Sequence, residues 1–198
     1  MNTLSSDDAK KLLDDRVQLK LYAAEQHLKN LQNLDKNGIY MNSSFQSRVY
    51  SETQIESLLF QLVGLVDALL IRVNDKLDLG LNEKSIYSNK KTVEQISNKL
   101  KTQGKGELLT ELQNALKSEE QNGVEKGEWL WNLRDLRNRG THRQLINILV
   151  TPDEKRIIQL MTSPQTDLEV LPYLESSINK TKNLIEDIIK NESLLKIH

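Results

Sequence analysis

Arginine is concentrated in one short segment of this chain, WLWNLRDLRNRGTHRQL, which runs from Trp129 to Leu145. Half of the chain's arginines lie in it, namely Arg134, Arg137, Arg139 and Arg143. A guanidinium holds a phosphate through paired N–H donors, and a histidine exchanges a proton near neutral pH. Together with His142, the segment therefore has the groups needed for RNA cleavage without a metal. In that reaction the 2′-hydroxyl attacks the adjacent phosphorus, and arginine stabilises the charge on the phosphoryl oxygens.

The spacing within this segment predicts a shared helical face. If the helix continues through Arg143, residues 134, 138 and 142 stack at intervals of four, which brings Arg134, Asn138 and His142 together beside Arg137. An asparagine there can hydrogen-bond a ribose hydroxyl or orient a neighbouring side chain. The leucine and tryptophan residues of the segment lie on a different side of the helix. We therefore expect the polar face to point toward water or a partner.

The six residues RNRGTH, Arg137 to His142, resemble the motif of HEPN domains. In that motif an arginine is followed directly by a polar residue, and four residues in all, including the polar one, separate the arginine from a histidine. The resemblance implies a helical bundle of the kind found in many prokaryotic toxin, abortive-infection and CRISPR-associated ribonucleases. It assigns catalytic roles to Arg137 as motif arginine, Asn138 as polar follower and His142 as motif histidine. It also implies that two such domains pair, so that both motifs line one cleft.

The remaining arginines of the segment, Arg134, Arg139 and Arg143, are expected to bind RNA beside the motif. A plainer interpretation stays open, because arginines near a helix C-terminus interact favourably with the helix dipole and can form a solvated face. His27 lies on the first helix, far from the motif in sequence, and is interpreted as incidental.

Composition excludes several other classes of protein. The formal net charge is -1, so attraction to a polyanion must come from a local patch. The chain has no cysteine, which removes disulfides and thiolate sites and agrees with a reducing compartment. It also has no HExxH motif, paired ExxH motif or phosphate-binding loop, so neither a metal site nor a cofactor is predicted. We expect a cytoplasmic protein without a signal peptide or membrane span.

Apolar periodicity predicts an all-α bundle of about five to six helices in a single domain covering residues 1–198. Capping signals and breaks place the helices at Ser6–Leu34, Ser51–Leu77, Thr92–Lys101, Glu107–Ser118, a motif helix from Trp129 to about Gly140, and Leu171–Lys190. The capping boxes are Ser5 with Asp8, Ser51 with Gln54, and Thr92 with Gln95. A small β-hairpin is predicted between Ile146 and Met161, although a helical interpretation of residues 141–150 stays open.

The sequence therefore favours a HEPN-like, metal-independent endoribonuclease or RNA-binding protein, for example of a toxin or defence system. We expect a homodimer held by Leu130 and Trp131 beside the motif helix, with an antitoxin or other protein as a further partner. The alternative is a non-catalytic helical module that binds a protein or a nucleotide through its arginine-rich face.

Overall fold

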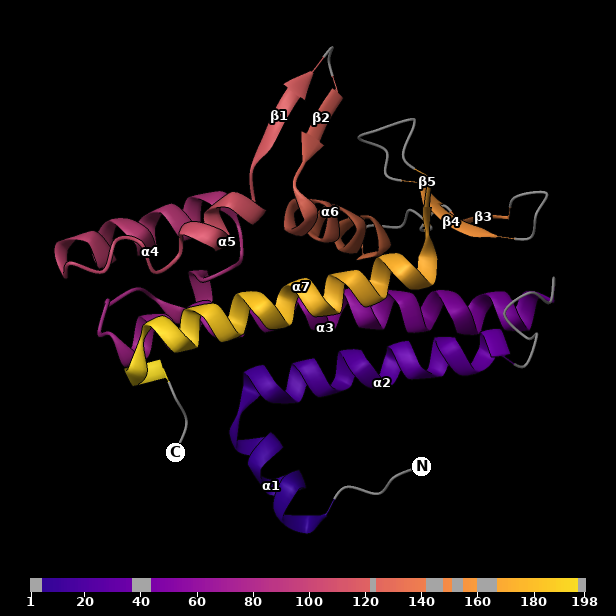
Figure 1. Ribbon diagram of the computed structural model, residues 1–198, viewed down its shortest axis with the longest axis horizontal. Helices are drawn as coiled ribbons and strands as arrows, with labels where there is room; N and C mark the ends of the chain where they lie inside the picture. Colours follow the sequence, from indigo (N-terminus) through magenta and orange to yellow (C-terminus); the bar gives the residue numbers. More distant parts are fainter. Residues whose placement is uncertain are drawn as a thin grey trace.

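The computed structural model describes residues 5–36, 44–121, 124–141, 148–150, 155–159 and 167–195. These residues form an all-α bundle with two small antiparallel sheets, as Figure 1 shows. The helices are α1 (Ser6–Asp14), α2 (Arg16–Lys36), α3 (Phe45–Lys76), α4 (Lys90–Thr102), α5 (Thr110–Ala115), α6 (Trp129–Thr141) and α7 (Val170–Asn191), with 3-10 turns η1 (Glu83–Ser85) and η2 (Ser193–Leu195). The strands are β1 (Ser118–Gln121), β2 (Val124–Gly127), β3 (Ile148–Val150), β4 (Arg156–Gln159) and β5 (Asp167–Glu169). The predicted fold class is confirmed.

Helix α3 is the centre of the bundle and packs against α2, α6 and α7. Its apolar side chains recur on nearly all sides, and ten of them are completely inaccessible to solvent: Ile55, Leu58, Leu59, Leu62, Val63, Leu65, Val66, Leu69, Leu70 and Val73. Burial of each side chain stabilises the fold by about 1.5–3 kcal/mol relative to exposure. The position of this helix therefore fixes the positions of its three neighbours.

By length and apolar character, α3 is also the one helix in the described ranges that could span a membrane. Of its most apolar window, 56% is buried inside the molecule. Packing against the three neighbouring helices accounts for these apolar residues.

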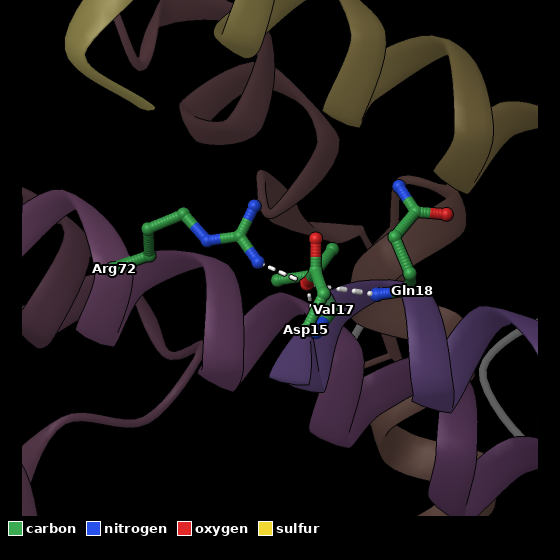
Figure 2. A network of polar contacts seen from close by, with 4 residues as sticks. All are labelled: Asp15, Val17, Gln18 and Arg72. Carbon is green, nitrogen blue, oxygen red and sulfur yellow. Dashed lines mark hydrogen bonds and ion pairs between the residues drawn. The ribbon is translucent and has the colours of Figure 1, made fainter. Parts of the chain in front are cut away.

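The first predicted helix is in fact two helices, and the break at Asp15 was missed. Asp15 has extended backbone angles, and its carboxylate accepts hydrogen bonds from the N–H groups of Val17 (2.9 Å) and Gln18 (3.1 Å) at the start of α2. The same oxygen accepts from the guanidinium of Arg72 in α3, as Figure 2 shows. Asp15 thus caps α2 and joins its first turn to the core helix. The predicted capping box of Ser5 with Asp8 is confirmed at α1.

The other two predicted capping boxes are wrong. Helix α3 begins at Phe45 with Ser44 as its N-cap, and Ser51 is buried inside it. Helix α4 begins at Lys90, because the Asn89 side chain accepts a hydrogen bond from the N–H of Thr92. In both cases a side-chain cap further upstream, Ser44 or Asn89, starts the helix before the predicted position.

The β-strands lie before and after the motif helix in the sequence. The predicted hairpin between Ile146 and Met161 is confirmed by the antiparallel pairing of β3 with β4. Strand β5 adds to β4 and leads directly into α7. The β1–β2 hairpin before α6 was not predicted, and it projects away from the bundle in Figure 1.

Candidate functional site

The motif helix α6 runs from Trp129 to Thr141 and buries one face against α3. Leu133 and Leu136 belong to this buried face, as predicted. Leu130 is also completely buried, so the expectation that it forms a dimer contact is wrong. The ring of Trp131 lies so close to Gly127 that a Cβ on that glycine would stand 2.1 Å from it. Trp131 therefore packs on the end of β2 in its own chain.

Arg139 is held within its own helix. Its guanidinium forms an ion pair with the carboxylate of Asp135, four residues earlier, and its side chain is 14% exposed. Arg139 lines neither of the two pockets described below. The structure therefore does not bring Arg139 together with Arg137.

Arg134 faces the core helix. Burial lowers the pKa of Arg134, while the carboxylate of Asp67 in α3 raises it and neighbouring Arg137 lowers it further. The expectation that the polar face points away from the core is therefore wrong for Arg134. The Asp67 carboxylate also accepts the N–H of Ser88 at 2.5 Å, which fixes its position.

Arg137 lines a pocket of about 260 Å³ to which α2 and α3 also contribute. The titratable residues of its lining are His27, Glu56 and Arg137, one from each of these helices. The interpretation of His27 as incidental therefore overlooked its position, because tertiary folding brings it to the motif arginine. The only local sequence signal that could have drawn attention to His27 is its position beside the apolar stripe of Ala24, Leu28 and Leu31.

The imidazole of His27 has a defined orientation. Its Nδ1 lies 2.8 Å from Oε1 of Gln54, and the same amide oxygen accepts a hydrogen bond from Nδ2 of Asn30 at 3.1 Å. Because an amide oxygen only accepts, Nδ1 carries the proton. In the neutral imidazole Nε2 then has the free lone pair. Gln54 thus fixes both the ring and its tautomer.

A second pocket, of about 560 Å³, adjoins the first. Arg137 and Phe60 line both pockets, so they lie at the boundary between them. Residues Glu56, Phe60, Gly64 and Asp67 recur at steps of four, four and three along α3, which places them on one face of that helix. This row spans about 16 Å at the helical rise of 1.5 Å per residue. The two pockets therefore adjoin each other along this face of α3, between α2 and α6, and together they are called the groove here.

The lining of this groove carries charges of both signs: Arg16, Lys20, Arg72, Lys76 and Arg137 against Asp14, Glu56, Asp67, Asp75 and Glu83. Burial lowers the pKa of Lys20, Arg16 lowers it further, and Asp67 raises it. The Lys20 ammonium lies 5.4 Å from the centre of the Phe60 ring, whose side chain is 52% exposed. It also reaches Gly64, where a Cβ would stand 2.8 Å from Nζ. The Asp67 carboxylate thus acts on both Lys20 and Arg134, and it partly offsets the like charges of Arg16 and Arg137 beside them.

Gly140 allows α6 to approach α3 closely at the smaller pocket. A Cβ on Gly140 would stand 3.3 Å from Cγ of Glu56, and both residues line the pocket. The motif helix was expected to end at about Gly140, and it ends at the next residue, Thr141. The missing side chain of Gly140 leaves the space that the pocket occupies.

The remaining predicted site residues are placed as follows. Asn138 is half-buried on α6 and lines neither pocket. His142 and Arg143 lie outside the described residues. No cluster of three or more histidine, aspartate or glutamate side chains suited to a metal ion occurs in the described part of the chain. The sequence predictions thus contributed Arg137 to the groove, whereas Arg134 lines neither pocket, and they missed His27, Glu56, Lys20 and Phe60.

Comparison of the chain with protein families, curated proteins and solved structures gives no significant match.

Proposed function

We propose that this chain is a metal-independent endoribonuclease whose scissile phosphate binds at Arg137. The observation that carries the proposal is the shared pocket of Arg137, His27 and Glu56. An arginine fork can hold two phosphoryl oxygens and stabilise the charge that builds up on them. An imidazole beside it can transfer the proton of the attacking 2′-hydroxyl. The motif histidine His142 follows one residue after the end of α6 and is part of the same proposal on sequence grounds.

The adjoining groove supports an extended, single-stranded substrate. Phe60 offers an exposed ring at the boundary of the two pockets, where a base can stack. Lys20 and Arg16 line the larger pocket together with Asp14, Asp67, Asp75 and Glu83, and a neighbouring phosphate can bind at these two cations. Pairing of two chains, with both motifs at one cleft, remains part of the proposal.

A second candidate is a nucleotide-binding module without catalysis. It is favoured by the size of the larger pocket, about 560 Å³, and by the mixture of cationic side chains, carboxylates and one aromatic ring in its lining. Cleavage of RNA separates the two candidates.

The test is incubation of the purified protein with a short single-stranded RNA of mixed sequence in the presence of EDTA. We expect cleavage that survives chelation, with products ending in a 2′,3′-cyclic phosphate or its hydrolysis product and a 5′-hydroxyl, because the nucleophile belongs to the substrate. Mass spectrometry of the fragments identifies these ends. Fragments that all end in a 3′-hydroxyl, or activity that EDTA abolishes, would contradict the proposed mechanism.

A further inference from the structure

His27 combines three properties that its neighbours in the smaller pocket do not share. Its tautomer is fixed by Gln54 and Asn30, so that Nε2 is the acceptor in the neutral ring. No hydrogen-bond partner for Nε2 occurs among the described residues. Among the described residues it is also the only histidine lining the pocket, with Glu56 of α3 and Arg137 of α6 as the other titratable groups. A base that is oriented by a second polar side chain is the usual arrangement for proton transfer in active sites.

We infer that His27 is the general base of this site, that Gln54 is its positioning residue, and that both act with Arg137 of the same chain. The inference rests on the proposed ribonuclease function and names a catalytic residue that the motif in α6 does not contain. Since the base and the phosphate-binding arginine come from one chain, proton removal needs no histidine from a second copy.

The step balances without a metal or an added reactant. Nε2 takes the proton from the 2′-hydroxyl as O2′ forms its bond to phosphorus, while Arg137 donates hydrogen bonds to the phosphoryl oxygens. The bond between phosphorus and O5′ then breaks, and O5′ takes a proton from solvent. The imidazolium returns one proton to solvent, which restores the neutral ring with Nδ1 still bonded to Gln54.

The first test replaces the imidazole and then returns it in solution. In single-turnover cleavage of the same RNA, we expect His27→Ala to lose about a hundredfold or more in rate. Free imidazole should partly restore the cleavage rate, because the truncated side chain leaves room beside the phosphate. The restored rate should increase with the concentration of unprotonated imidazole. The pH–rate profile of His27→Ala without imidazole should lack the part that depends on a histidine base.

A second pair of variants, at Gln54, tests the inference even if His27→Ala does not fold. Gln54→Glu keeps an oxygen acceptor for Nδ1, so we expect cleavage to persist. Gln54→Leu removes the acceptor and releases the ring, so we expect a rate loss that imidazole does not repair. Thermal melting of each variant shows whether it is folded.

Each outcome decides the inference. If wild-type protein cuts RNA and His27→Ala cuts at the same rate, the inference is wrong and the ribonuclease proposal stands. A folded His27→Ala that is slow, is not rescued by imidazole and keeps the wild-type pH profile also overturns it. Equal rates for Gln54→Glu and Gln54→Leu would remove the positioning role. Wild-type protein that cuts no RNA overturns both the inference and the proposed function.

Discussion

Arg137→Ala is expected to slow RNA cleavage by a factor of about a hundred to a thousand, the usual cost of removing one group that stabilises charge in a transition state. Arg137 lines both pockets of the groove, and it is the arginine that the smaller pocket places with His27 and Glu56. Loss of its side chain leaves the phosphoryl oxygens without their paired donors. Arg137→Lys keeps the charge but loses the planar fork, so its rate should lie between those of the alanine variant and the wild type.

The matched control is Arg139→Ala. Arg139 lies two residues further along α6, is paired with Asp135, and lines neither pocket. We expect this variant to cut RNA at close to the wild-type rate. Rates from single-turnover assays and midpoints from thermal melting, taken on the same preparations, separate chemistry from folding. A folded Arg137→Ala protein with wild-type activity would remove Arg137 from the site.

Asp15→Ala is expected to lower the free energy of unfolding by about 3 kcal/mol, through the loss of a helix cap and of a largely buried ion pair. The carboxylate accepts two N–H groups of α2 and the guanidinium of Arg72. The side chains of Asp15 and Arg72 are each only 11% exposed, so the remaining guanidinium is left with little water. For a chain of this size the melting midpoint should fall by about 6 to 12 °C.

Two controls assign this loss to its parts. Asp15→Asn keeps a side-chain oxygen for the cap and removes the charge, so it should be less destabilising than Asp15→Ala. Asp14→Ala removes the neighbouring, exposed carboxylate and should change stability by less than about 0.5 kcal/mol. Equal melting midpoints for Asp15→Ala and the wild type would show that the contact in Figure 2 does not stabilise the fold.

The long helices were predictable because their apolar residues repeat at the helical period. Helix α7 was expected at Leu171–Lys190 and is found at Val170–Asn191. Its buried residues Leu174, Ile178, Ile185 and Ile188 are among those that define the repeat. A pattern of this kind depends only on local spacing, so it survives folding unchanged.

The break at Asp15 was not predictable from the same pattern, because the apolar repeat continues through it from Leu13 to Val17. At this break Asp15 caps α2 and contacts Arg72, which lies 57 residues further along the chain. Similarly, Ser51 and Gln54 have the spacing of a capping box, but both lie inside α3. Gln54 instead accepts a hydrogen bond from His27. The β1–β2 hairpin did have a local signal, the Asn-Gly dipeptide at 122–123, which favours two-residue turns.

The candidate site was predictable only as far as the motif segment. The arginines of α6 attracted attention because they are close together in sequence. The groups that complete the pocket, His27 and Glu56, come from helices whose patterns identify only a buried face and an exposed face. Which exposed residues meet across three helices depends on how those helices pack, and the spacing within one helix does not contain that information.

The central claim is that RNA is bound and cut in the pocket beside Arg137, and the most direct measurement is RNA cleavage by Gly140→Leu and Gly140→Ala. A Cβ on Gly140 would already stand 3.3 Å from Glu56 Cγ, a contact that this exposed glutamate can accommodate by a small movement. The further carbons of leucine would enter a pocket of about 260 Å³. Displacement of the substrate by ~1 Å is enough to slow catalysis about a hundredfold. The account predicts that both variants fold, that Gly140→Ala cuts RNA, and that Gly140→Leu does not. Equal cleavage by the two variants would contradict it.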